Sequence, residues 1–431
     1  LSAPTTGKAT EATSPSAAAP ADLESFADAA RRFLQTTAAR RPAEAATAEW
    51  GSGPDRIAYF SSDPPEIDRA NVAAARAWQR RRYDAGFGWI TGPREYGGCG
   101  LTAVHDLVYD SIEAQYDVPD TGVLAVIGLG MIGPTILAHA RDHIKARYLP
   151  AMYSGDVIAC QLFSEPAAGS DLASVQTKAI ADGNDWVLNG QKVWTSIAQH
   201  AQIGMALCRT DNDAPKHKGI TAFLVDMSAP GVEVRPLRQM TGGADFNEVF
   251  LTDVRVPDDH RLGTVHGGWR VALTTLMNER ATVGGEGSDS VIRALSQPFL
   301  TKLMEVNGRL DDGALRRELA KLLADLTASQ YLNHQALRRL QSGQDPGPEG
   351  SVSKLMFAQN LTRAAHFAAE VLGPKLSADT GEWGTYAWSE LLLSVPALRI
   401  LGGTEEIMKN ILGERVLGLP KEPAPGKDNP R

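Results

Sequence analysis

Two short segments in the middle of the chain hold most of the side chains that could do chemistry. The first is a turn rich in proline, glycine and hydroxyl groups that follows an apolar run, Cys160-Gln-Leu-Phe-Ser-Glu-Pro-Ala-Ala-Gly-Ser-Asp171. Hydroxyls and backbone N–H groups in such a turn can hold an anion or the polar edge of a ring. An ordinary surface loop has the same composition, so the turn alone only suggests a ligand.

The second segment is Lys192-Val-Trp-Thr-Ser196, which follows an Asn-Gly pair. We expect Asn189-Gly190 to form a hairpin turn, because both positions of such a turn favour residues that tolerate a positive φ. Side chains alternate along the strand that follows, so Trp194 and Ser196 should share one face while Thr195 points to the other. An indole beside a hydroxyl suits a flat ligand with polar edges, although a lone tryptophan is more often part of a core.

The elements that must position these segments follow the order α, β, α. From about Leu23 to Tyr153 the apolar residues recur at helical steps of three and four. Short β-branched runs separated by Gly, Asn, Asp and Pro then predict an antiparallel β region. Helical texture returns from Trp269, with amphipathic helices expected over 312–342, 352–373 and 404–417. The sequence therefore predicts an α+β multidomain protein.

These changes in residue pattern divide the chain into three domains and two terminal segments. We expect helical domains over 23–155 and 263–417, on either side of a β domain over 156–262. The terminal segments 1–22 and 418–431 are rich in small residues or proline and are expected to lack regular structure.

Composition narrows the partners and the compartment. The 431 residues have a formal net charge of −8, which argues against a nucleic acid partner. Three scattered cysteines are too few for a disulfide framework or a zinc site, so we expect no metal and a cytoplasmic location.

The uncharged stretch 121–140 contains two misleading features. Its length allows a membrane span, and it contains the glycine pattern of dinucleotide-binding folds, Gly128-Leu-Gly-Met-Ile-Gly133. A central proline and His139 argue against the span, while helical flanks without a correctly spaced acidic residue argue against a Rossmann fold. We expect a buried helix, and a nicotinamide-dependent dehydrogenase stays as an alternative.

Four motifs together resemble the acyl-CoA dehydrogenase family. SEPAAGSD and NGQKVWTS match its flavin loop and the hairpin after it, FNEVFLTDVRVP its last β segment, and LGGTEEIMKNILGERVLGLP its C-terminal helix. The resemblance runs in order from about residue 23 to residue 420. It implies an N-terminal α-helical domain, a middle antiparallel β-barrel-like domain and a C-terminal four-helix bundle.

The resemblance also implies FAD as cofactor, with acyl-CoA oxidised to trans-2-enoyl-CoA and electrons passed to an electron-transfer flavoprotein. Trp194 would pack on the isoalloxazine, Ser196 would reach flavin N5, and Ser170 would contact the cofactor or the CoA. The cofactor contacts carried over by the resemblance are Gln161, Leu162, Phe163, Ser164, Gly169, Ser170, Trp194, Thr195, Ser196, Thr404 and Glu406.

The catalytic base departs from the commoner family pattern. Many members place a glutamate in a Tyr-Glu-Gly-Thr stretch, but here Gly402 stands at that position. A subset of the family has its base on an earlier helix before an arginine, which resembles Asn278-Glu279-Arg280. We therefore expect Glu279 to be the base, with Asn278 and Arg280 contacting substrate; a surface glutamate paired with a cation is the alternative.

Assembly and reaction type stay open at this point. The family's cross-subunit flavin motifs are altered around Arg293 and Glu370, so a homodimer, a homotetramer and a hetero-oligomer with a paralogous chain are all compatible. A same-fold flavin oxidase or monooxygenase needs no acid at residue 402, and a non-catalytic subunit needs no base at all. The type of acyl group cannot be read from the sequence.

Overall fold

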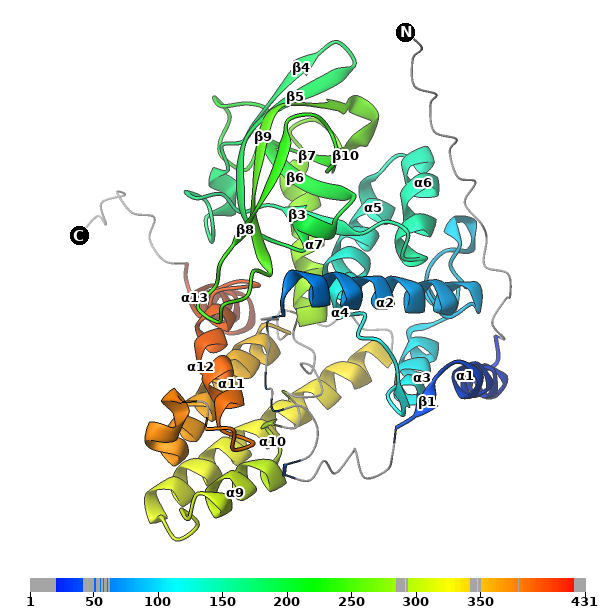
Figure 1. Ribbon diagram of the computed structural model, residues 1–431. Coiled ribbons are helices and arrows are strands. Elements are labelled where there is room, and N and C mark those ends of the chain that lie inside the picture. Colours follow the sequence, from blue (N-terminus) through cyan, green and yellow to red (C-terminus); the bar gives the residue numbers. More distant parts are fainter. Residues whose placement is uncertain are drawn as a thin grey trace, which may run out of the picture.

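The chain forms one large sheet and two groups of helices: in Figure 1 the sheet lies at the top, the N-terminal helices to its right and below, and the C-terminal helices below it. The computed structural model describes residues 21–41, 50–51, 55, 57, 60, 63–283, 291, 294–341, 347, 350–378 and 380–421. The expected unstructured segments therefore lie outside the described residues, except for residues 21–22 and 418–421.

The N-terminal helices bury the faces that the apolar spacing predicts. Phe26, Ala30 and Leu34 of the first helix are fully buried, whereas Leu23 at its start is exposed. Asp22 caps this helix by accepting a hydrogen bond from the Ser25 backbone N–H. The helices of this group are α1 (Leu23–Thr37), α2 (Pro65–Asp84), α3 (Ala103–Glu113), α4 (Gly122–Leu124), η3 (Ala125–Ile132), α5 (Gly133–His139) and α6 (Asp142–Tyr153).

The uncharged stretch 121–140 is a buried, irregular helix. Its middle part, η3, is a π-helix that contains Gly128, and Gly133 begins α5. The three motif glycines therefore lie within consecutive helical turns, not in a strand-to-helix loop, which removes the dinucleotide-binding alternative. None of the helices in the described part of the chain is long and apolar enough to cross a membrane.

Eight strands form one twisted sheet in the order β10-β7-β6-β4-β5-β9-β8, with β3 paired to β6. Most pairs are antiparallel, but β3 and β4 both pair with β6 in parallel, which differs from the purely antiparallel expectation. The strands are β3 (Ala159–Leu162), β4 (Lys178–Asp182), β5 (Asp185–Ser196), β6 (Ile203–Arg209), β7 (Ile220–Asp226), β8 (Val232–Leu237), β9 (Phe246–Pro257) and β10 (Arg261–Leu262).

The predicted hairpin at Asn189-Gly190 is wrong. The turn lies at Gly183-Asn184, where Asp182 pairs with Asp185, and β5 continues through residues 189–190, where its register against β9 shifts. Gly190 is needed there for a different reason: an added Cβ would come within 2.7 Å of the Thr177 Cα. The Asn-Gly pair thus marks a close approach of two backbones within the sheet.

The C-terminal helices pack around a second core that includes Leu303, Leu361 and Trp388. Residues expected as single helices over 312–342 and 352–373 form α10 and α11, while 404–417 divides into α13 and a π turn. The helices are α7 (Gly268–Val283), α9 (Gln297–Val306), α10 (Gly313–Gln341), α11 (Gly350–Leu372), η7 (Gly373–Ser377), α12 (Tyr386–Leu398), α13 (Glu405–Ile411) and η8 (Leu412–Val416).

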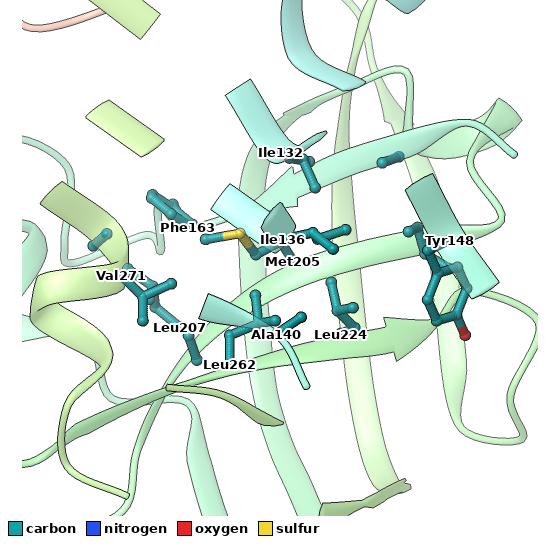
Figure 2. Packing of buried hydrophobic residues seen from close by; sticks show 14 of the residues in the cluster. Ile132, Ile136, Ala140, Tyr148, Phe163, Met205, Leu207, Leu224, Leu262 and Val271 are labelled. Atoms are coloured by element: carbon teal, nitrogen blue, oxygen red, sulfur yellow. The ribbon is translucent and has the colours of Figure 1, made fainter. Parts of the chain in front are cut away.

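Helix α7 joins the sheet to this C-terminal group. Val271 of α7 lies in one buried cluster with Leu207 of β6 and Ile136 of α5 (Figure 2). Farther along, α7 packs against α11 (Figure 1). The last turns of α7 therefore lie between the sheet and α11.

The close approach at Gly190 gives a first prediction. We expect Gly190→Ala to lower the free energy of unfolding by about 1–3 kcal/mol, because the Thr177 backbone must move to admit the methyl group. Thermal and denaturant unfolding would measure the change. Gly350→Ala is the matched control, since a Cβ there meets no atom within 4 Å; an equal loss in both variants would contradict the explanation.

Candidate functional site

The loop after β3 is held against β5 by its backbone. The Val193 N–H donates to the Ser164 carbonyl at 2.9 Å, and Glu165 and Ala168 exchange two hydrogen bonds that close the turn. The two motifs singled out in the sequence therefore lie side by side in the sheet.

A buried ion pair fixes this contact. The Lys192 ammonium has no exposed surface and donates to Glu165 Oε1 at 2.8 Å, to the Phe163 carbonyl at 3.1 Å and to the Leu207 carbonyl at 2.7 Å. Glu165 also accepts from the backbone N–H groups of Gln176 and Thr177 at 2.6 and 2.9 Å. All three ammonium protons have acceptors, as a buried cation requires.

Electrostatics at Glu165 follow from these contacts. Burial by itself raises the pKa of the Glu165 carboxyl, but the Lys192 charge and the hydrogen bonds from Lys192, Thr177 and Gln176 outweigh it and hold the pKa below its ordinary value. The Glu165 carboxylate is therefore ionised at neutral pH.

Trp194 presents its indole to the outside of the sheet. Its side chain is 62% exposed, and its φ of 61° places it in the left-handed region, within a bulge between Lys192 and Thr195. Its ring meets Phe246 edge-on with centroids 6.0 Å apart. Thr195 is buried and Ser196 half-buried, so the predicted alternation holds across the bulge.

The remaining positions of the loop differ in accessibility. Leu162 and Phe163 are buried and Gln161 and Ser164 half-buried, so the first two can offer a ligand only backbone groups. Gly169 and Ser170 are exposed. A Cβ at Gly169 would meet no atom within 4 Å, so packing within the chain does not demand a glycine there.

Asp171 closes this loop on its outer side. It accepts two hydrogen bonds of 2.8 Å from Lys216 and one of 2.5 Å from Ser174. These bonds, led by the one from Lys216, lower the pKa of Asp171. The pair is solvent-exposed and contributes little to stability.

Glu279 lies half-buried near the end of α7. Ala272, two turns before it, and Thr275, one turn before it, are fully buried, and Leu276 packs against the central core. Two members of the expected apolar face, Ala272 and Leu276, are therefore confirmed, while the side chain of Val283 lies outside the described residues. Asn278 donates to the Thr274 carbonyl at 3.0 Å, while the side chain of Arg280 lies outside the described residues.

The loop before α13 carries the other two predicted contacts. Thr404 caps α13 by accepting a hydrogen bond from the Ile407 N–H at 3.2 Å, and Glu406 is exposed. Both line a cavity of about 370 Å³ between α11, α12 and α13, together with His366 and Arg399.

Gly402 has a conformation that favours glycine. Its φ is 63°, and Gly403 follows with a φ of 91°. A residue with a side chain in the left-handed region costs about 1–2 kcal/mol. The missing acid at residue 402 is thus accompanied by a backbone shape that would disfavour one.

The structure brings the predicted residues into two groups. The first group lies on the sheet and the loop after β3: Gln161 to Ser170 and Trp194 to Ser196. The second group lies on the C-terminal helices: Asn278 and Glu279 on α7, and Thr404 and Glu406 at the start of α13. Helix α7 links the two groups, because it packs against β6 and β7 of the sheet and against α11. Sequence reasoning missed Glu165, Lys192 and the buried Lys354 of α11. The local sequence gives little signal for them, because each stands beside polar residues as well as apolar ones.

These features fit a flavin. An exposed indole next to a half-buried hydroxyl, and a glycine that no packing requires, provide a face and a backbone approach for a flat ring. Within the described residues, His, Cys, Asp and Glu side chains form no cluster of three that could hold a metal ion.

Three family models cover most of the chain. They describe the acyl-CoA dehydrogenase N-terminal domain over residues 20–156, the middle domain over 160–254 and the C-terminal domain over 266–417. Members of this family are flavoproteins that bind FAD.

Curated relatives agree with this. Acyl-CoA dehydrogenase FadE34 of Mycobacterium tuberculosis is 40% identical over 83% of this chain, which spans only 48% of FadE34. Acyl-CoA dehydrogenase IpdE1 of the same organism is 38% identical over 80% of this chain and 88% of its own length. The solved ChsE4-ChsE5 complex of Mycobacterium tuberculosis matches with a TM-score of 0.66 and 26% identity, over 92% of this chain and 98% of the matched chain.

The buried ion pair gives the second prediction. We expect Lys192→Met to cost about 3–5 kcal/mol of unfolding free energy, because it leaves a buried carboxylate without its cation. The deficit should narrow below about pH 4, since a carboxyl with a lowered pKa loses its stabilising effect as it is protonated in the folded protein.

Lys302→Met is the matched control, because Lys302 makes a comparable 3.0 Å ion pair with Glu305 on the surface of α9. Chemical denaturation at pH 7 and at about pH 3 would measure both variants. A Lys192→Met protein as stable as the control at pH 7 would contradict the role of the pair.

Proposed function

The chain belongs to the acyl-CoA dehydrogenase family, and from that premise we propose that it oxidises an acyl-CoA thioester to the trans-2-enoyl-CoA with Glu279 as base. As a member of this family it is an oxidoreductase that acts on a CH–CH group with a flavin. The observation that carries the proposal is the half-buried position of Glu279 near the end of α7, because α7 packs against α11, whose Lys354 donates a hydrogen bond to the Gly403 carbonyl of the Gly402 loop.

FAD would lie against the face made by the β3 loop and β5. Backbone groups of Gln161 to Ser164, the Ser164 and Ser196 hydroxyls and the Trp194 indole would hold it there, and the open backbone at Gly169 would admit it. When bound, FAD accepts the hydride that leaves Cβ of the substrate.

Glu279 would take the proton from Cα of the thioester while the Cβ–H bond breaks and the double bond forms. Gly402 cannot accept a proton, so the reaction needs a carboxylate from another element. Glu279 is half-buried on the face of α7 that carries the buried Ala272, which restricts the access of water to the carboxylate.

The proposal also names residues that contact the substrate and FAD, an electron acceptor and an assembly. Ser170, Asn278 and Arg280 would contact the acyl-CoA, and Thr404 and Glu406 would reach FAD from the cavity beside α13. Reduced flavin would pass its electrons to an electron-transfer flavoprotein. One similar structure is a complex of two differently named chains. The proposed assembly is therefore either a homo-oligomer or a hetero-oligomer with a paralogous chain.

A second candidate function follows from Gly402. Its left-handed backbone and missing acid would also suit a non-catalytic subunit that supports an active partner. A flavin oxidase of the same fold would instead reoxidise its flavin rapidly in air.

The third prediction concerns the base. Glu279→Gln should bind FAD and acyl-CoA as the wild type does. Its flavin should be reduced about 10²–10⁴-fold more slowly, which is the usual contribution of a general base. The amide is nearly the size of the carboxylate, so the fold should be kept. Anaerobic stopped-flow spectroscopy of the flavin band measures the rate.

The matched control is Glu318→Gln on the exposed face of α10, where the carboxylate pairs only with Lys321 at 2.8 Å among the contacts described. It should reduce flavin at the wild-type rate. If Glu279→Gln also kept that rate with a good substrate, Glu279 would not be the base, and the oxidase and non-catalytic candidates would gain.

A further inference from the structure

A lysine in the C-terminal helices is buried directly beneath the loop that precedes α13. Lys354 of α11 is 2% exposed. Its ammonium donates to the Leu398 carbonyl at 3.0 Å and to the Gly403 carbonyl at 2.7 Å. These two acceptors lie at the beginning and near the end of the loop that contains Gly402.

The loop is closed from its other side as well. The Glu405 N–H donates to the Arg399 carbonyl at 3.1 Å, and the Arg399 guanidinium donates to both Glu405 oxygens at 2.9 and 3.3 Å. Arg399 lowers the pKa of Glu405 through these bonds. Lys354 therefore supplies the inner anchor of a loop whose outer anchor is an Arg–Glu pair.

The surroundings of Lys354 include the proposed base. Burial lowers the pKa of the Lys354 ammonium, and the negative charges of Glu405, Glu279 and Glu406 oppose that lowering. Glu405 and Glu406 belong to α13 and Glu279 to α7, and both helices pack against α11 (Figure 1). A cation with two carbonyl acceptors and three nearby carboxylates is suited to stay charged.

We propose that Lys354 is a positioning residue of the active site, which anchors the 398–404 loop and presents its positive charge to Glu279. The anchoring fixes Gly402 and Gly403 in their left-handed conformations and thereby the place of Thr404. The charge stabilises the carboxylate form of Glu279, the form that can accept a proton. This second role rests on the proposed function; the first does not.

The test compares Lys354→Met, which keeps the aliphatic stem, with Lys354→Arg, which keeps the charge. Lys321→Met on the exposed face of α10 is the matched control. Hydrogen–deuterium exchange of the full-length protein reports on the loop without substrate, and the pH dependence of anaerobic flavin reduction by an acyl-CoA reports on the base.

We expect Lys354→Met to speed amide exchange over residues 399–406 and to slow flavin reduction about tenfold at pH 7. The acid side of its pH profile should move up by about one pH unit, because a nearby cation no longer favours the carboxylate. Lys354→Arg should keep the wild-type pH profile, which a merely structural role would not require.

Unchanged loop exchange in Lys354→Met would overturn the anchoring role, and an unmoved acid limb would overturn the electrostatic one. If Lys354→Met does not fold, the Arg variant decides: a wild-type profile supports the proposal, and a shifted profile or failure to fold overturns it. If the wild-type flavin is never reduced by an acyl-CoA, the proposed function and the electrostatic role both fail, while the exchange data still judge the loop.

Discussion

The buried pair between Lys192 and Glu165 is the contact on which the sheet side of the site depends. It joins the end of β3 to β5 and draws in β6 through the Leu207 carbonyl, so three strands meet at one ammonium group. Removing two charges from water is costly, and only complete hydrogen bonding makes it tolerable. The geometry that follows is specific: Ser164 is tied to Val193, and Trp194 is turned outward by the bulge directly after Lys192.

The helical side of the site depends on α7 and α11. Buried Val271 and Ala272 fix α7 against the central core, and this leaves Glu279 one to two turns beyond it. From the opposite side, Lys354 holds the loop in which most of the family would carry an acid. Residue 402 is a glycine and not an acid, and its backbone is left-handed. The two features agree, because a residue with a side chain would be strained at that φ.

Much of this could be predicted from the sequence, for identifiable reasons. Helical spacing predicted α1, α10 and α11, because α1 and α11 each bury an apolar stripe and the first half of α10 buries Leu315, Leu319 and Leu322. The Asn-Gly pair misled, because Gly190 is required by the nearby Thr177 backbone, a contact that is invisible in local sequence. The partners of Lys192 and Lys354 were likewise out of reach, since each ammonium binds carbonyls distant in the chain. The sequence motifs already grouped the predicted site residues that lie on the sheet. Only the structure shows that α7 connects this group to the residues on the C-terminal helices.

The most direct measurement is an anaerobic titration of the purified, FAD-loaded protein with straight-chain, branched and steroid-side-chain acyl-CoAs. We expect the protein to show flavin absorption bands at about 370 and 450 nm, the usual positions for this cofactor. At least one acyl-CoA should bleach the 450 nm band and yield one equivalent of 2-enoyl-CoA. A protein that takes up no FAD, alone or with a paralogous chain, or whose flavin stays oxidised with every acyl-CoA, would contradict it.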